Sequence, residues 1–545
     1  MIRLRAARTL LVGFAVAACT WSAHASRQRP STFQQQSARP QSLPFDVLVT
    51  GGRLVDGTGA PARRADIGIR HRRIAAIGRL SNQSAHETID ASGFVVAPGF
   101  IDVHTHADDV AEHARAENFV RMGLTSIVAG NCGESALDIG DALSTLRDGG
   151  MSVNFATLIG HNTVRRAAMG TDDREPTAAE MTKMKSLVWR GMVDGAVGFS
   201  TGLQYVPGTY AAPPEIIELA RVAAVSGGLY ASHMRNEGTA LAQSVRETIQ
   251  VGEAARCPVQ ISHLKVDSPN RWGASAEALS LIDAARARGL QVAADQYAYT
   301  AASSTLGIRF PSWALEGGSA RISERLNDAA TWGRIRREMQ QLLAERGFTD
   351  LTFAVVAAYR PDPSLNGLTM KQVASKLKGS ESVDAQLEAA REMMLGGGAS
   401  MVYHLMSDDD VTTIMRHPHV AFASDSSVLA FGSGMPHPRG YGNNARVLSE
   451  YVRQRGVITL EEAIRKMTSL PARHFRLANR GAIAEGYAAD IVIFDPSRVA
   501  DTATFATPHS YPVGIHTVLV NGVAVLRSGE HTGARPGEVL TVGDR

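Results

Sequence analysis

The sequence predicts an α/β protein built on a TIM-like (β/α)8 barrel, with a small β-sandwich domain formed by segments from both ends of the chain. Two observations lead to this expectation. Eight short apolar runs alternate with amphipathic segments between residues 93 and 427, which is typical of a closed parallel barrel. On both sides of this region, β-branched runs are broken by glycine and aspartate, as in a small sheet domain.

The first 25 residues are typical of an export signal. Arginines precede an apolar run from Leu10 to Ala18, which is too short to cross a bilayer as a stable helix. Two processing sites compete: "AHA" at 23–25 has a small-x-small form, whereas "VAAC" at 16–19 resembles a bacterial lipoprotein box that would leave Cys19 lipidated. The alternative is a buried N-terminal helix. We therefore expect an exported bacterial protein, periplasmic or anchored to the membrane only if Cys19 carries lipid.

The rest of the chain divides into three parts. Residues 26–43 are rich in proline, glutamine and serine, so we expect a disordered tether. Residues 44–95 and 480–545 are expected to form the small β domain, and 96–479 the barrel. The long stretch between the seventh and eighth apolar runs predicts a helical insertion near 305–415.

Composition excludes some functions. The chain has 545 residues, 44% hydrophobic and 20% charged, with a formal net charge of +3. Its arginines are dispersed and form no basic block, so we expect no nucleic-acid partner. Beyond Cys19 only Cys132 and Cys257 remain, too few for a disulfide framework. These features do not predict an oligomeric state.

Side chains of the types that bind metals follow most of the apolar runs. In run order they are His104 and His106, Cys132, His161, His233, His263 and Asp425. The carboxyl ends of barrel strands converge on one mouth, and alternate residues of a strand share a face. Imidazole, thiolate and carboxylate are ligands that zinc accepts. The sequence therefore predicts a metal site at the mouth of the barrel, although "SDSS" around Asp425 is also a good helix N-cap.

Several segments carry a family resemblance that runs from about Phe45 to the C-terminus. They are "GFIDVHTH", "GNCG", "GFSTGLQYVPGTYA", "YASHMRNEG", "QISHLK", "DQYAYTAASS", "HPRGYG", "RKMTSLPA" and "ADIVIFDP". In this order they resemble the amidohydrolase superfamily and, within it, the N-acyl-D-amino-acid deacylases, also called D-aminoacylases.

The resemblance implies a zinc site with a distinct bridging ligand. Most binuclear amidohydrolases bridge two metals with a carboxylated lysine after the fourth strand, but here that strand ends "GAVGFSTG" without lysine. The thiolate of Cys132 is then the bridging anion. The family pattern assigns Cys132, His233 and His263 to one tight Zn²⁺ site. It assigns His104, His106 and Asp425 to a second, weaker position.

The resemblance also implies a reaction. A small-molecule N-acyl-D-amino acid would be hydrolysed to a carboxylate and a free D-amino acid. Asp425 would take the proton of the attacking water and pass it to the leaving nitrogen. Lys265, two residues after His263, and Tyr297 would bind the substrate carboxylate; the alternative for both is an ordinary rim position. Arg439, in "HPRGYG", matches the family without an assigned role.

Two other functions stay open at this point. Another amidohydrolase could act on a D-dipeptide or a cyclic amide such as hydantoin or dihydropyrimidine, although cyclic-amide hydrolases usually need the missing fourth-strand lysine. A non-catalytic metal-binding envelope protein would be expected to have lost a ligand or the aspartate, and this sequence retains them all. The preference for D-substrates follows from the resemblance alone.

Overall fold

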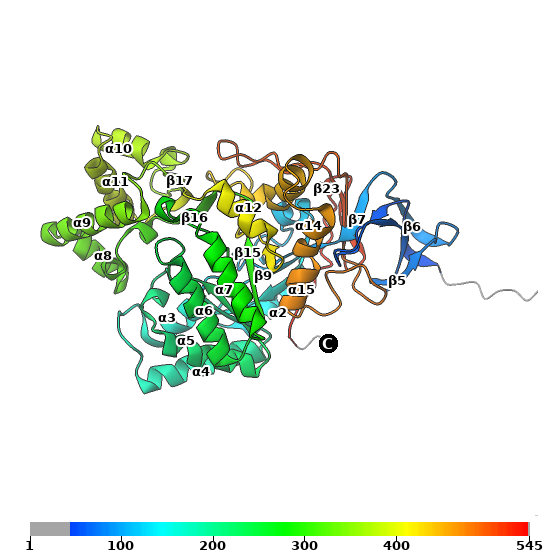
Figure 1. Cartoon of the computed structure of the whole chain (residues 1–545), viewed down its shortest axis with the longest axis horizontal. Coiled ribbons are helices and arrows are strands. Elements are labelled where there is room, and N and C mark those ends of the chain that lie inside the picture. Colours follow the sequence, from blue (N-terminus) through cyan, green and yellow to red (C-terminus); the bar gives the residue numbers. More distant parts are fainter. Residues whose placement is uncertain (1–43, 543–545) are drawn as a thin grey trace, which may run out of the picture. The chain divides into compact units, whose positions relative to one another are not determined.

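The computed structural model describes residues 44–542, so the predicted export signal and tether lie outside the described residues. Eight parallel strand positions form the central barrel (Figure 1). In chain order the strands are β8 (Phe100–Asp102), β9 (Leu124–Ala129), β10 (Asn154–Thr157) continued by β11 (Ile159–Gly160), β12 (Gly198–Gly202), β13 (Leu229–His233), β14 (Val259–Ile261), β15 (Val292–Gln296) and β19 (Val420–Phe422). Each lies within one of the eight apolar runs, which confirms the predicted fold class.

The barrel closes between its first and last strands. Thr105, just after β8, forms a parallel bridge with Ser426, just after β19. The Asp425 N–H donates to the His104 carbonyl at 2.9 Å, and the His106 N–H donates to the Ser426 carbonyl at 2.9 Å. The closing hydrogen bonds therefore join the segments that carry "HTH" and "SDSS".

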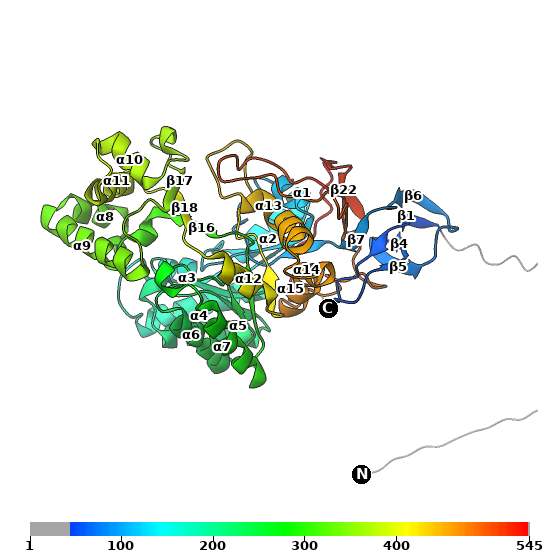
Figure 2. The ribbon, with the colours of Figure 1, turned by 45° about the horizontal axis from the view of Figure 1, so that its top comes forward.

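Helices follow the strands and pack outside them (Figure 2). They are α1 (Glu117–Arg121), α2 (Ile139–Gly149), α3 (His161–Met169), α4 (Ala178–Val193), α5 (Pro213–Val225), α6 (Leu241–Ala255), α7 (Ser275–Ala287), α12 (Asp408–Arg416), α13 (Arg439–Arg446), α14 (Leu460–Met467) and α15 (Ser469–His474). Local sequence explains their limits: Thr177 and Glu180 form a capping box on α4, and α5 begins with two prolines. Among the described residues, no helix is long and apolar enough to cross a membrane.

An insertion lies between β15 and β19. Its antiparallel sheet has the order β16 (Ala301–Thr305), β18 (Ser400–His404), β17 (Ala354–Ala358). Four longer helices cover it, at the upper left of Figure 1: α8 (Gly318–Asn327), α9 (Ala329–Arg346), α10 (Met370–Lys378) and α11 (Val383–Leu395). Since β16 follows the seventh barrel strand closely, the insertion borders the mouth of the barrel.

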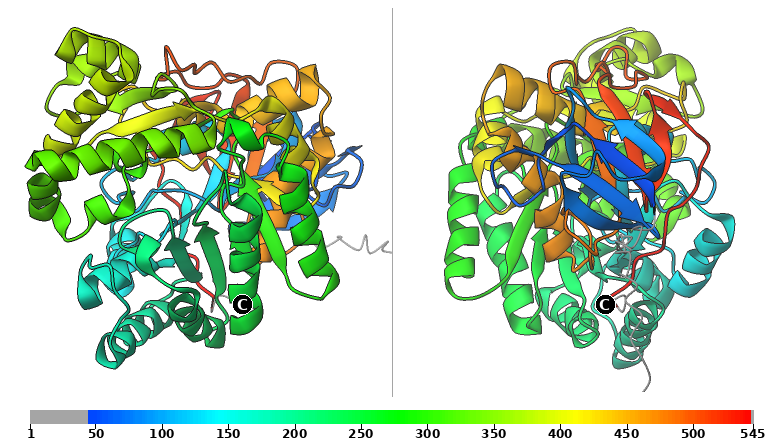
Figure 3. Two further views of the ribbon diagram at one scale, coloured as in Figure 1. Left: turned by 60° about the vertical axis from the view of Figure 1, so that its left-hand side comes forward. Right: turned by 90° about the vertical axis from the view of Figure 1, so that its right-hand side faces the viewer.

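The two ends of the described chain share a β-sandwich. One sheet has the order β5 (Arg73–Gly78), β4 (Asp66–Arg70), β1 (Phe45–Thr50), β6 (Ala85–Asp90). The other has the order β23 (Glu530–His531), β22 (Val523–Arg527), β21 (Ile515–Val520), β20 (Ile491–Phe494), β7 (Val95–Pro98), β2 (Arg53–Leu54), β3 (Arg63–Arg64). Antiparallel pairing of β20 with β7 joins the C-terminal strands to the N-terminal ones (Figure 3). Val47, Ile67 and Ile491 share one apolar core between the sheets.

Candidate active site and metal centre

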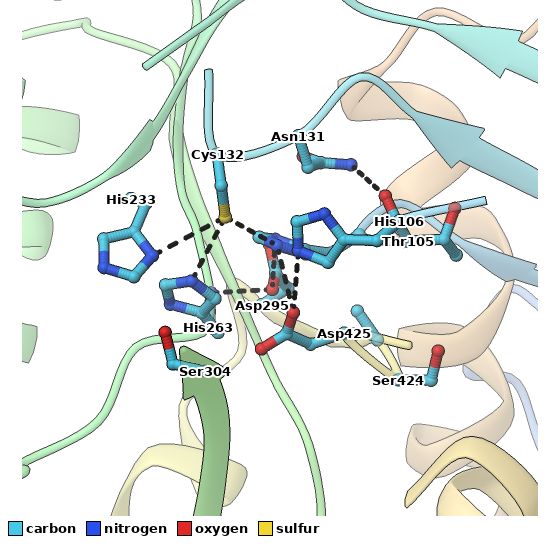
Figure 4. Close-up of polar contacts among 12 residues, drawn as sticks. Thr105, His106, Asn131, Cys132, His233, His263, Asp295, Ser304, Ser424 and Asp425 are labelled. Atoms are coloured by element: carbon cyan, nitrogen blue, oxygen red, sulfur yellow. Dashed lines mark hydrogen bonds and ion pairs between the residues drawn. The ribbon is translucent and has the colours of Figure 1, made fainter. Parts of the chain in front are cut away.

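Cys132 lies among three histidines at the mouth of the barrel. Its Sγ is 3.4 Å from His104 Nε2, 3.5 Å from His233 Nδ1 and 3.6 Å from His263 Nε2 (Figure 4). Zinc binds sulfur at about 2.3 Å and nitrogen at about 2.0–2.1 Å, so two such ligands of a tetrahedral ion lie about 3.5 Å apart. The spacing and chemistry of this donor set therefore fit zinc.

The second ring nitrogen of each histidine lies near an oxygen atom, an arrangement typical of metal-binding imidazoles. The contacts are His104 Nδ1 to Asp295 Oδ1 at 3.4 Å, His233 Nε2 to Gln204 Oε1 at 3.0 Å, and His263 Nδ1 to Glu237 Oε1 at 2.9 Å. In all three cases the acceptor lies on the side of the ring away from Cys132. One ring nitrogen of each of the three histidines thus faces the same sulfur.

A second group of candidate ligands adjoins the first and shares His104 with it. Asp425 Oδ1 lies 3.2 Å from His106 Nε2 and 3.6 Å from His104 Nε2. The other carboxylate oxygen of Asp425 forms an ion pair with Arg439 Nη1 at 3.0 Å. The predicted ligands therefore form two adjoining sets, one around Cys132 and one around Asp425, and a third candidate group joins His233 and His263 to Glu237, which the sequence did not single out.

Charge at the site is set by burial and by these neighbours. Burial raises the pKa of the Cys132 thiol, but His104 and His233 outweigh it and hold this pKa well below its usual range. Burial likewise raises the pKa of Asp425, while Arg439, His106 and His104 hold it well below its ordinary value. These neighbours favour the thiolate of Cys132 and the carboxylate of Asp425, the forms in which both side chains bind cations.

Local backbone conformation aims three of these side chains. Cys132, His263 and Asp425 have φ values of 53°, 34° and 50°. Residues other than glycine rarely adopt this left-handed backbone conformation, and those that do are concentrated at functional sites. Each of the three follows directly on a barrel strand or its last extended residues, where the chain turns sharply.

The fourth strand supports the turn that carries Cys132. Ser200 on β12 accepts the Gly133 N–H at 3.1 Å and donates to the Gly130 carbonyl at 2.5 Å. A Cβ at Gly202 would lie 2.0 Å from the Cys132 carbonyl oxygen, so only glycine fits there. The strand that lacks a bridging lysine thus contributes a hydroxyl and a close backbone approach that hold the cysteine turn.

Lys265 and Tyr297, predicted to bind substrate, are both buried beside this site. The Lys265 ammonium forms an ion pair with Glu237 Oε2 at 2.7 Å and donates to the His263 carbonyl at 2.9 Å. The Arg439 guanidinium stacks over the Tyr297 ring at 4.5 Å, and the Tyr297 hydroxyl lies 3.9 Å from the Met406 sulfur. A cationic and phenolic wall therefore lies next to Asp425.

His161 ends the third apolar run as the other histidines end theirs, but it lies outside the metal cluster. It begins α3, and its Nε2 lies 2.8 Å from Glu215 Oε1, which also accepts Arg165 Nε at 3.1 Å. His161 belongs to none of the candidate ligand groups among the described residues. Position at a strand end was therefore not enough to predict a ligand.

Comparison with known proteins agrees with this fold and site. Residues 87–526 match the model of the amidohydrolase family. A D-aminoacylase of Alcaligenes xylosoxydans xylosoxydans is 37% identical over 92% of this chain and 99% of its own length. The chain therefore belongs to the amidohydrolase family and, within it, to the N-acyl-D-amino-acid deacylases, as its motifs predicted.

Solved structures extend the comparison. An N-acyl-D-glutamate deacylase from Bordetella bronchiseptica, complexed with zinc and a phosphonate mimic of the tetrahedral intermediate, has a TM-score of 0.78 and 36% identity. A D-aminoacylase studied for its binuclear metal centre, with one-metal activation and second-metal attenuation, has the same TM-score and identity. Both alignments cover 91% of this chain and all of the other.

Proposed function

We propose that this protein is a zinc-dependent hydrolase that cleaves N-acyl-D-amino acids to a carboxylate and a free D-amino acid. The observation that carries the proposal is the Cys132 cluster, in which one ring nitrogen of each of three histidines lies within 3.6 Å of the sulfur and the Asp425 carboxylate lies beside them. The D-preference is supported by the relatives, which act on D-amino-acid derivatives according to their names.

We infer that Cys132, His233 and His263 hold one tight zinc ion, and that His104, His106 and Asp425 form a second, weaker position. Because Cys132 Sγ also lies 3.4 Å from His104, the thiolate is placed to bridge the two. When bound, zinc polarises a carbonyl oxygen and lowers the pKa of a coordinated water to about 7. The D-aminoacylase activated by one metal and attenuated by a second supports this division.

Asp425 is placed to move the proton. Its Oδ2 is held by Arg439, while its Oδ1 faces the histidines, so one oxygen anchors the carboxylate and the other is available to react. Oδ1 accepts the proton of the attacking water and then donates it to the amide nitrogen as the C–N bond breaks. The carboxylate leaves this cycle as it entered, ionised.

The basic side chains beside Asp425 suit the substrate carboxylate. Lys265 has three N–H donors, and its polar neighbours are Glu237 Oε2, the His263 carbonyl and His263 Nδ1. When His263 Nδ1 carries its own proton, one donor of Lys265 is left for a ligand. The Tyr297 hydroxyl has only the weak Met406 sulfur acceptor nearby, so it can donate to a ligand. We propose that these two groups bind the α-carboxylate of the substrate. Substrates in which this carboxylate is converted to an amide or an ester are therefore expected to be poor ones.

Hydrolysis of enantiomeric substrates tests the proposal. We expect zinc-containing protein lacking residues 1–25 to release amino acid from N-acetyl-D-methionine much faster than from N-acetyl-L-methionine. Acidic N-acyl-D-amino acids, D-dipeptides, hydantoin and dihydropyrimidine define the substrate range on the same sample. Turnover of the cyclic amides alone would contradict the proposal, and zinc binding without turnover of any amide would favour a non-catalytic protein.

We further propose that the protein is exported and that residues 1–25 direct this export. The arginine-flanked apolar run and its two processing sites support the proposal. Mass analysis of the mature N-terminus, with cell fractionation, distinguishes the two outcomes: a periplasmic protein beginning near Ser26, or a membrane-associated one with lipidated Cys19. In the second case Cys19→Ala is expected to release the protein from the membrane fraction. Retention of an intact N-terminus in the cytoplasm would contradict export.

A further inference from the structure

Glu237 is a buried carboxylate that the proposed reaction does not use. It lies in the loop between β13 and α6 and is 1% exposed. Hydrogen bonds tie the loop down: the Asp267 N–H donates to the Glu237 carbonyl at 3.0 Å, and the Asn236 side chain accepts the N–H groups of Gly238 and Ala240, each at 2.9 Å. Such a fixed, desolvated anion needs partners that compensate its charge.

Glu237 and Lys265 compete for one ring nitrogen of His263. Glu237 Oε1 lies 2.9 Å from His263 Nδ1, and Lys265 Nζ lies 2.8 Å from the same atom. If Nδ1 keeps its proton and donates to Glu237, Nε2 is a free lone pair facing Cys132. If Lys265 donates to Nδ1, Nε2 carries the proton instead and cannot bind a metal. The tautomer of His263 therefore depends on which neighbour prevails.

The ion pair between these neighbours resolves the competition. Glu237 Oε2 forms an ion pair with Lys265 Nζ at 2.7 Å, while Oε1 lies 2.9 Å from His263 Nδ1 and makes no hydrogen bond of its own in the described structure. One carboxylate thus pairs with the competing donor and offers a free acceptor for the imidazole proton. Direct ligation of a metal by Glu237 is disfavoured, because a cation there would lie against the Lys265 ammonium.

We propose that Glu237 is a positioning residue of the metal centre, which keeps the proton on His263 Nδ1 and binds the Lys265 ammonium, so that His263 Nε2 is free for zinc. The inference rests on the zinc site of the proposed function. It adds that one buried carboxylate both orients the metal ligand His263 and pairs with Lys265, the cation of the substrate-binding wall. Partners of this kind typically change metal affinity by about 10–100-fold.

The test compares zinc affinity between variants, by competition with a chelator at fixed pH. Glu237→Gln is expected to bind zinc about 10–100-fold more weakly than the wild type. Lys265→Met is expected to keep near-wild-type zinc affinity and to raise KM, because Glu237 still accepts from His263. A purely structural ion pair predicts equal losses from either end, and that result would overturn the proposal. So would unchanged affinity in Glu237→Gln.

Glu215→Gln is the matched control. Glu215 is also a buried glutamate between a histidine and a cation, His161 and Arg165, but outside the candidate ligand groups. We expect it to bind zinc as the wild type does.

If Glu237→Gln does not fold because Lys265 is left buried and unpaired, Lys265→Met is compared with Glu237→Gln/Lys265→Met. The double variant is expected to bind zinc about tenfold more weakly, and equal affinities would overturn the proposal. If the wild-type protein itself bound no zinc in this competition, the proposed function would be refuted instead.

Discussion

Replacement of Cys132 by alanine is expected to abolish tight zinc binding and amide hydrolysis together. The thiolate lies within 3.6 Å of His104, His233 and His263 at once, so its removal leaves both candidate metal positions incomplete. A metal ion contributes several kcal/mol to transition-state stabilisation. Since about 1.4 kcal/mol is tenfold in rate, kcat/KM should fall by about a thousandfold or more.

Cys257→Ala provides the control for this prediction. Cys257 is also a buried free thiol, but burial raises its pKa to about 11, so it stays protonated and is no metal ligand. We expect this variant to keep its zinc and its activity. Zinc content by elemental analysis and kcat/KM are measured on the same samples, and wild-type zinc content in Cys132→Ala would contradict the assigned ligand set.

Asp425→Asn is expected to retain the tight zinc while kcat falls by about 10²–10⁴-fold. Asparagine has nearly the same shape and still offers an oxygen to Arg439, but its amide cannot accept and return a proton. The proposed tight set of Cys132, His233 and His263 does not include Asp425, so metal content should separate from turnover. Kinetics and zinc content of one preparation test both parts.

A buried aspartate away from the site is the control for Asp425. Asp410 accepts the Ser275 hydroxyl at 2.5 Å and the Gly273 N–H at 2.9 Å and belongs to no candidate ligand group. Asp410→Asn is expected to leave kcat per folded molecule unchanged. Full activity in Asp425→Asn would show that another group moves the proton.

The sequence predicted the barrel and the approach of its ligands because both follow from periodic patterns. Apolar runs separated by helices define the strands, and strand ends converge in a parallel barrel. His104 and His106 are two residues apart, so their proximity needs no long-range information. The bridge between Thr105 and Ser426 then brings Asp425 to them, as expected when the eighth strand closes on the first.

Contacts that depend on loops were not predictable in the same way. Glu237 meets His263 only because its loop is hydrogen-bonded to Asp267, and no periodicity encodes that. Arg439 reaches Asp425 from the start of α13, across an irregular segment. The one signal in the sequence was position: each lies in a segment already singled out, "SHMRNEG" or "HPRGYG".

Titration of zinc-free protein with zinc tests the central claim most directly. Bound zinc and release of D-methionine from N-acetyl-D-methionine are followed in one experiment. Activity is expected to rise in proportion to the first equivalent of zinc and to gain little or fall with the second. Full D-selective hydrolysis in protein that contains no metal, or zinc binding that never restores hydrolysis, would contradict the account.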